Sequence, residues 1–369
     1  MHYLDHAATT PLRPEALGAM QQQWQEVGNP SSLHTAGRRA RRVVEESREQ
    51  IAAIVGAKPA DIIFTSGGTE ADNLALKGLA RNTDRRRVLV SAVEHHAVLD
   101  PADALADEAK TVELIPVDAQ GRVDVAALEL MLDDDVAVVA VMWANNEVGT
   151  VQPVAQIAQM CAARGVPFHT DAVQALGQLD LDLEGIPSAA LSAHKVGGPV
   201  GVGALVLDRD LSVRPLVHGG GQERDVRSGT LDAAGIAGFA AALAADKPDL
   251  APLRDRLIDG VRRVVPDAVL NGDPVDRLPN NAHFSFPGCP GDALLMLLDA
   301  AGVAVSTGSA CTAGIPQPSH VLMAMGADEP LARSSLRFSL GWNSTDDDVA
   351  ALLTALPAVV ERARRAGGM

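Results

Sequence analysis

Cysteine is rare in this sequence: 369 residues contain only three, Cys161, Cys289 and Cys311, and they lie far apart. No CxxC pair and no pair of histidines at ligand spacing accompanies them. This argues against a disulfide framework and against a structural zinc site. Free thiols are typical of a reducing compartment, so we expect the protein in the cytoplasm.

Long apolar runs and positive charge are also scarce. No run reaches the roughly 18 residues that a membrane-spanning helix requires, and the start, MHYLDHAATTPL, lacks the features of a secretory signal. We therefore expect no membrane partner. The formal net charge of -16 gives no general attraction to nucleic acid, so no direct nucleic-acid contact is expected. The arginines at 38–42 are followed closely by glutamates, which favours a solvated helix face.

Seven short apolar runs rich in β-branched residues alternate with helical patterns. They cover residues 62–66, 87–93, 112–117, 136–143, 166–171, 189–193 and 203–208. Runs that are apolar throughout are typical of strands covered by helices on both faces. The sequence predicts an α/β fold, with a large domain (14–247) that contains a mostly parallel seven-stranded sheet flanked by helices. Past about residue 248 the regular alternation of apolar runs and helical patterns stops, which predicts a smaller α+β domain made of residues 1–13 and 248–369.

Chemically capable residues follow five of these runs directly. The segments are SGGTE, EHHA, ANNE, DAVQ and HKVGGP. Because ligands of such sheets bind outside the carboxyl ends of the strands, the five ends predict one composite active site.

Two of these strand ends suggest a covalent cofactor. Among five lysines, only Lys195 follows an apolar strand, where partial desolvation would lower its pKa and favour a Schiff base with an aldehyde. The alternative is a surface lysine. Asp171 ends another strand, with Gln174 three residues later. Its carboxylate either pairs with a protonated pyridine nitrogen or caps a following helix.

The segments SGGTEADN (66–73) and EHHA (94–97) suggest where such a cofactor is held. The first opens a helix, and its free N–H groups with the hydroxyls of Ser66 and Thr69 suit a phosphate. It is neither a Walker A loop nor a dinucleotide fingerprint. The adjacent histidines of the second cannot both face one ion from a regular strand, so a ring stacked on a cofactor is favoured over a metal site.

Cys311 and Arg337 are the remaining candidates. Cys311 lies among small polar residues, STGSACTAG, which predicts an accessible loop and a nucleophilic thiolate, or else an incidental loop cysteine. Cys161 lies on a helical pattern and Cys289 in a tight Pro/Gly turn. Arg337 lies in an apolar strand-like run and needs an anionic partner there, either a substrate carboxylate or a structural salt bridge.

Ten motifs, taken in order, resemble the cysteine desulfurase family, which are fold-type I pyridoxal-phosphate enzymes of the class V aminotransferase group. They are YLDHAATTP, GNPSSLH, TSGGTEADN, EHHAVLD, NNEVGTVQP, HTDAVQALG, SAHKVGGPVGVG, GGGQERDVRSGT, GSACTAG and SSLRFSLG. The resemblance runs from Tyr3 to about Gly341. It implies a homodimer that removes sulfur from L-cysteine, leaving L-alanine, and holds it as a persulfide on Cys311. The sulfur then passes to acceptor proteins, such as an iron–sulfur scaffold or a tRNA-thiolation enzyme.

The same resemblance implies residue roles around pyridoxal 5'-phosphate. Lys195 would carry the cofactor, Asp171 would pair with its pyridine nitrogen, and His95 would stack on the ring and act in catalysis. Gln174 and Asn146 would hold the ring hydroxyl side. The phosphate would be bound by Gly68, Thr69, Ser192, His194 and, from the other subunit, Thr230.

The substrate carboxylate would be held by Arg337, with Asn29 nearby. No metal is implied in the isolated enzyme, although Cys311, on a loop at about 304–318, would be available as a transient iron–sulfur ligand shared with a partner. Two residues depart from the usual family pattern: Gln222 replaces a frequent histidine, and Asp225 replaces a usual glycine. Both fall near the implied dimer contact and remove no catalytic group.

Three other functions stay open on the sequence. A selenocysteine lyase or another C–S lyase on the same fold would spare the nucleophilic cysteine, and an ordinary aminotransferase would have no use for it. A catalytically silent scaffold would not need an intact Lys195 and Asp171. Cys311 in its GSACT setting weighs against the first two.

Overall fold

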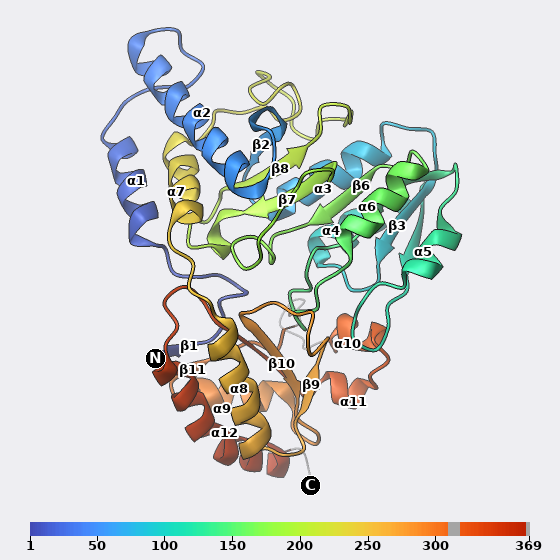
Figure 1. Ribbon diagram of the computed structural model, residues 1–369, viewed down its shortest axis with the longest axis vertical. Helices are drawn as coiled ribbons and strands as arrows, with labels where there is room; N and C mark the ends of the chain where they lie inside the picture. The colour runs from blue at the N-terminus through green and yellow to red at the C-terminus, as the bar shows by residue number, and fades with distance from the viewer. Residues whose placement is uncertain (309–317, 367–369) are drawn as a thin grey trace.

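A seven-stranded sheet forms the larger part of the computed structural model, which describes residues 1–308 and 318–366 (Figure 1). The strand order is β2-β8-β7-β6-β5-β3-β4, and in this sheet only β8 runs antiparallel to its neighbours. The strands are Ile62–Thr65 (β2), Arg87–Ser91 (β3), Thr111–Ile115 (β4), Val136–Ala140 (β5), Phe168–Asp171 (β6), Ser188–Ser192 (β7) and Gly203–Leu207 (β8). All seven predicted runs form strands, and the predicted α/β fold is confirmed.

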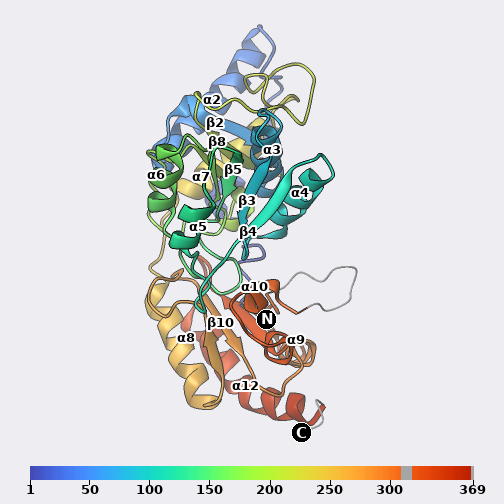
Figure 2. The same ribbon diagram turned by 90° about the vertical axis from the view of Figure 1, so that its right-hand side faces the viewer.

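Helices cover both faces of this sheet. Figure 2 shows α3 and α4 on one face and α5, α6 and α7 on the other. Along β5, Val139 packs into the core under α6 while Val138 packs into the core under α4. This two-sided burial is why the strand sequences are apolar throughout. The helices are Pro14–Trp24 (α1), Thr35–Val55 (α2), Gly68–Ala80 (α3), His96–Ala106 (α4), Val125–Met131 (α5), Val154–Ala163 (α6) and Ala233–Ala244 (α7), with 3-10 turns at Pro59–Asp61 and Ala193–Lys195.

The smaller part has its own hydrophobic core. Phe284, Phe286 and Phe338 are buried there with Leu4. Its strands and helices are His2–Tyr3 (β1), Ala251–Val264 (α8), Val269–Asn271 (β9), Asn281–Ser285 (β10), Gly291–Ala300 (α9), Val303–Ala304 (β11), His320–Ala324 (α10), Glu329–Ala332 (α11), Ser335–Ser339 (β12) and Asp346–Ala366 (α12). Strands β12, β10 and β9 form an antiparallel sheet, and β1 pairs with β11. Throughout the described ranges, no helix is long and apolar enough to cross a membrane.

The chain begins in the smaller part and then crosses to the larger one. Strand β1 pairs in parallel with β11, and helix α1 packs beside α7 in the larger part (Figure 1). The two parts have separate hydrophobic cores. We propose that they are the two domains expected from the sequence, with boundaries at residues 13 and 247.

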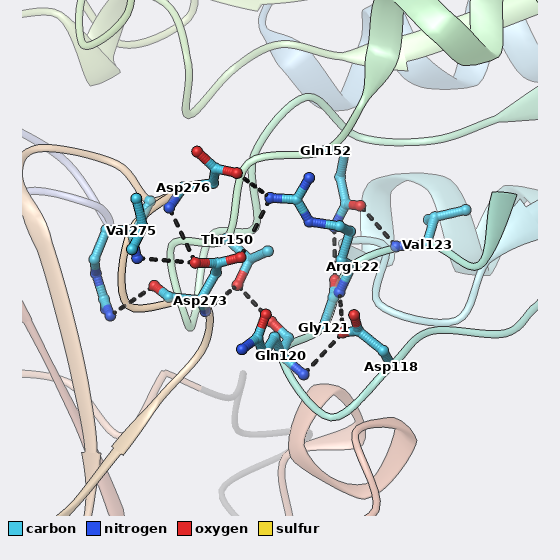
Figure 3. Close-up of polar contacts among 11 residues, drawn as sticks. Asp118, Gln120, Gly121, Arg122, Val123, Thr150, Gln152, Asp273, Val275 and Asp276 are labelled. Atoms are coloured by element: carbon cyan, nitrogen blue, oxygen red, sulfur yellow. Dashed lines mark hydrogen bonds and ion pairs between the residues drawn. The ribbon is translucent and has the colours of Figure 1, made fainter.

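A polar junction joins the two parts on one side of the molecule (Figure 3). Arg122 of the larger part forms ion pairs with Asp273, at 3.2 Å, and Asp276, at 2.5 Å, of the smaller part. Beneath them, the buried hydroxyl of Thr150 donates to the carbonyl of Gln120 (2.6 Å) and accepts from the backbone N–H of Asp273 (3.0 Å). One hydroxyl therefore satisfies backbone groups from both parts.

Replacing Thr150 with valine should lower the free energy of unfolding by about 1 to 3 kcal/mol, because it leaves the buried N–H of Asp273 unpaired and removes the bond to the Gln120 carbonyl, with little change in side-chain volume. Urea denaturation followed by circular dichroism would measure the loss. The matched control is Thr354→Val, which removes a hydroxyl from the exposed face of α12, where it bonds only to the carbonyl of Ala350. Equal effects at both positions would contradict a stabilising role for the junction.

Candidate active site

A cavity of about 420 Å³ lies where the carboxyl ends of the parallel strands face the smaller part. Its volume falls in the range of cofactor sites, roughly 300–1,000 Å³. The sequence analysis had placed ten of its lining residues in the site: Gly68, Thr69, His95, Asn146, Asp171, Gln174, Ser192, His194, Lys195 and Arg337. The strand ends therefore do converge on one site, as the fold class requires.

Three predicted site residues are not among the lining residues. Asn29 is exposed in the α1–α2 connection, where its side-chain oxygen accepts from the backbone N–H of Ser31 at 2.9 Å. Thr230 is exposed just before α7. Their assigned roles stay predictions. Cys311 lies outside the described residues.

The amine of Lys195 is enclosed by backbone carbonyls. Its Nζ donates to the carbonyl oxygens of Ala7 at 2.6 Å and Ala8 at 2.8 Å. Burial lowers the pKa of this amine to about 8; Arg337 adds to the effect, while Asp171 and Asp5 oppose it. A sizeable uncharged fraction at neutral pH makes the amine a nucleophile toward an aldehyde. The alternative of a solvated surface lysine does not fit this position.

Asp171 is buried at the end of β6 with a carboxylate on the cavity wall. One oxygen accepts the backbone N–H of Val173 at 2.9 Å, and burial raises the pKa of the carboxyl to about 6. Turns rather than a helix follow this residue, so the helix-capping alternative is wrong. An ionised carboxylate here is suited to hold a proton on a pyridine nitrogen.

The start of α3 forms the anion-binding end of the cavity. The first turn approaches closely because of glycine: a Cβ on Gly68 would lie 2.7 Å from Cγ2 of Val173, and one on Gly203 would lie 2.6 Å from Cα of Gly67. Unpaired N–H groups and the positive end of the helix dipole favour a phosphate there. Ser192 and His194 line the cavity with them.

His95 caps α4 and faces the cavity. Its Nδ1 accepts the backbone N–H of Ala97 at 3.0 Å, which places the proton of the neutral ring on Nε2. Enclosure, together with the Lys195 charge, lowers the pKa of this imidazole to about 4. The neighbouring His96 bonds instead to Asp100 at 2.9 Å. In the part of the chain that the structure describes, no three His, Cys, Asp or Glu side chains are grouped to hold a metal.

Arg337 lies buried in β12 and reaches the cavity between Asn146 and Asp5. One terminal nitrogen, Nη1, donates to the Asn146 carbonyl at 2.9 Å, and Nη2 donates to Oδ1 of Asp5 at 2.8 Å. Arg337 therefore does form a structural salt bridge, with Asp5, and it also lines the cavity. Nε of Arg337 and Oδ1 of Asn146 are buried with no hydrogen-bond partner among the described residues. Such unmet polar groups are suited to a ligand.

These features together fit pyridoxal phosphate. The cavity offers a lysine amine of lowered pKa for the aldehyde, a buried carboxylate for the pyridine nitrogen, an unpartnered amide oxygen, and a helix N-terminus for the phosphate. The donors and acceptors differ in kind, and each matches a different part of that molecule.

Sequence reasoning missed the carboxylates around this cavity. Asp72 lines it and bonds to Nε2 of His169 at 3.0 Å, and the other nitrogen of that ring meets Ser188 Oγ at 2.8 Å. Burial raises the pKa of Asp72 well above its usual value and that of Glu94 to about 8. Burial thus disfavours the charged form of all three carboxyls, and among them Asp171 has the nearby charge of Lys195 to favour its ionised form. The position of Asp72, one helical turn after Gly68, was a usable signal because residues i and i+4 share a helix face.

The sequence matches the aminotransferase class-V family over residues 2–352. The IscS-like cysteine desulfurase of Mycobacterium tuberculosis is 54% identical, over 99% of this chain and 98% of that protein. A solved structure described as a NifS-like protein has a TM-score of 0.90 and 35% identity, and covers 98% of this chain and 99% of its own. Another, described as SspA in complex with cysteine, has a TM-score of 0.83 and 32% identity over 94% of this chain and 100% of its own.

The fold and the cavity are those of a pyridoxal-phosphate-dependent enzyme of fold-type I. The chain belongs to the aminotransferase class-V family, and its near-full-length relatives place it among the cysteine desulfurases of the IscS and NifS kind. The family resemblance inferred from the ten motifs is confirmed.

The lowered pKa of Lys195 predicts how capture of the cofactor depends on pH. Below a pKa of about 8 the uncharged amine rises about tenfold per pH unit, and above it the amine is mostly uncharged. Cofactor-free protein mixed with pyridoxal phosphate should therefore capture it about tenfold faster at pH 7 than at pH 6, and the rate should level off above about pH 8.5. Borohydride trapping at timed intervals, followed by peptide mass mapping, measures the adduct.

A rate that climbs steadily to pH 10 would instead indicate an ordinary, solvated lysine. The control is Lys195→Ala, which should yield no trapped adduct at any pH.

Proposed function

We propose that this protein is a cysteine desulfurase that uses pyridoxal 5'-phosphate to remove sulfur from L-cysteine, leaving L-alanine and a persulfide on Cys311. The supporting observation is the amine of Lys195, whose pKa is lowered to about 8, in one cavity with the Asp171 carboxylate and the Arg337 guanidinium. A buried amine, a buried anion and an arginine fork are the groups that an amino-acid substrate and an aldehyde cofactor need.

Each residue has a distinct task in this proposal. Pyridoxal phosphate, when bound, supplies an electron sink for the charge that forms at the substrate Cα. Lys195 moves the Cα proton as a free amine, and Asp171 holds the proton on the pyridine nitrogen. Arg337 orients the substrate through its carboxylate. His95, neutral with its proton on Nε2, is placed to donate that proton within the cavity.

The choice of Cys311 as the sulfur acceptor is supported by the state of the other two cysteines. Cys161 and Cys289 are both buried. Burial raises the pKa of Cys161 to about 12 and that of Cys289 above its usual value, so neither offers a thiolate near neutral pH. Sγ of Cys311 would attack the substrate sulfur. The electron pair of the broken Cβ–S bond stays on carbon, which takes a proton to give L-alanine.

A homodimer in the cytoplasm completes the proposal. Around Asn29, the side chains of Trp24, Val27 and Leu33 are 62%, 84% and 88% exposed. Apolar groups this exposed favour a protein contact, and a second subunit covering them would approach Asn29 and Thr230. The persulfide would pass to sulfur-acceptor proteins of iron–sulfur assembly or tRNA thiolation. Transient ligation of a cluster by Cys311 would belong to that transfer.

Replacing Cys311 with serine tests the proposed reaction. The variant should bind pyridoxal phosphate with an unchanged visible absorbance and should lose sulfide release from L-cysteine with dithiothreitol by more than about a hundredfold, because a hydroxyl cannot form a persulfide. Cys289→Ser is the matched control, since this buried thiol bonds to the Val360 carbonyl at 3.7 Å and interacts with Arg364, and it is not part of the cavity lining; it should keep its activity. Undiminished sulfide release by Cys311→Ser would favour a C–S lyase instead.

Replacing Arg337 with glutamine tests the carboxylate anchor separately. Holoenzyme affinity for L-alanine, measured from the change in cofactor absorbance, should fall about 10- to 100-fold, because a charge-assisted hydrogen bond is lost. Affinity for cysteamine, which has the amine and thiol but no carboxylate, should stay unchanged. An equal loss for both ligands would argue for a general distortion of the cavity.

A further inference from the structure

The guanidinium of Arg337 already has an anionic partner before any substrate arrives. Its Nη2 donates to Oδ1 of Asp5 at 2.8 Å, and the two side chains are only 5% and 22% exposed. Water therefore screens this pair less than it screens a surface pair, so the charge of Asp5 is felt by anything that binds to Arg337.

Backbone contacts hold Asp5 in this place. Asp5 forms a bridge with Ser339 at the end of β12, and Tyr3 donates its hydroxyl to the Asp5 carbonyl at 3.1 Å. Two residues on, the backbone N–H of Ala7 donates to Ser339 Oγ at 2.8 Å. These bonds fix the backbone at Asp5, and the Nη2–Oδ1 bond holds its carboxylate against Arg337, so a ligand that binds Arg337 with this bond intact must share the guanidinium with Asp5.

No other described group takes over this role. Glu147 also lies near Arg337, but it accepts from Ser319 Oγ at 2.5 Å, and burial raises the pKa of its carboxyl. His283 faces Arg337 across the β10–β12 pair, and burial lowers its pKa to about 3, so it carries no charge. Among the residues described, Asp5 supplies the carboxylate that is bonded to the guanidinium.

We propose that Asp5 is a built-in counter-charge that weakens the hold of Arg337 on the carboxylate of the bound amino acid. The inference rests on the proposed role of Arg337 as the carboxylate anchor. Two carboxylates that share one guanidinium lie about 5 Å apart, and their repulsion offsets part of the attraction to the arginine. Asp5 is thus a positioning and affinity-setting residue, and it does not touch the reacting atoms.

This arrangement has a consequence for turnover. The carboxylate of L-cysteine is retained in L-alanine, so Arg337 binds substrate and product alike, and such uniform binding does not accelerate the chemical step. An uncompensated buried guanidinium would retain the product as strongly as the substrate. With Asp5 in place, the anchor still orients the amino acid but releases alanine more readily.

The test is Asp5→Asn, which keeps an oxygen to accept from Nη2 and removes the negative charge. The holoenzyme variant should bind L-alanine about tenfold more tightly, or about 1.4 kcal/mol, as measured by titration of the cofactor absorbance. Its affinity for cysteamine should change by less than about twofold, because that ligand has no carboxylate to be repelled.

Asp348→Asn is the matched control. Asp348 pairs with His2, and its side chain is 19% exposed, close to the 22% of Asp5, but it has no contact with Arg337. The control should leave both affinities unchanged. If Asp5→Asn does not yield holoenzyme, Asp5→Ser, a second uncharged variant, carries the same expectation for L-alanine.

Two results would overturn the proposal. Weaker or unchanged L-alanine binding in the uncharged variants would mean that Asp5 only orients Arg337. Equal tightening toward L-alanine and cysteamine would mean that Asp5 acts through Lys195, since it also opposes the lowering of the pKa of that amine. Normal binding of L-alanine by Arg337→Gln would instead refute the role of Arg337 as the carboxylate anchor. The double variant Asp5→Asn with Arg337→Gln tells failure of the Asp5 proposal from failure of the anchor. If both hold, the double variant should not bind L-alanine more tightly than Arg337→Gln alone.

Discussion

The two cations of the cavity, Lys195 and Arg337, each have a hydrogen-bond partner in residues 5–8 at the start of the chain. The Ala7 and Ala8 carbonyls accept from the lysine amine, and the Asp5 carboxylate accepts from the guanidinium. This short crossing segment bonds to both cations and so helps to fix where they lie relative to each other. The strands of the large sheet bring the other site residues close, but the geometry of these two charges depends on this segment.

Burial disfavours negative charge on three acids in and near the cavity. Asp72, Glu94 and Asp171 are all buried, and three ionised carboxylates in a low-dielectric site would repel one another. The His169 ring bonds to Asp72, while Asp171 is helped by a backbone N–H and by Lys195. Of the three, Asp171 has a neighbouring cation that favours its charged form, and it lies at the position where a pyridinium needs a negative charge.

The sheet and half of the site were predictable because local chemistry dictates them. Two-sided burial makes a strand such as β5 apolar at each position, and the end of each strand is then marked by the first polar residue. Lys195 and Asp171 were found in this way. What the sequence could not reveal was contact between distant residues: the pairing of Asp5 with Arg337 spans 332 positions, and that of Asp72 with His169 spans 97. No periodicity encodes such partners.

The crossing segment also sets when the site is completed during synthesis. Strand β1 has its pairing partner in β11, at residues 303–304, and Leu4 belongs to the core that contains Phe338. The first residues to leave the ribosome must wait for about 300 more, which takes roughly 15 to 60 s at ordinary translation rates. Until then the Ala7 and Ala8 carbonyls, although already synthesised, are not held against Lys195, and Arg337 is still to be made. The enclosed site of the Lys195 amine is therefore complete only when the polypeptide is nearly whole.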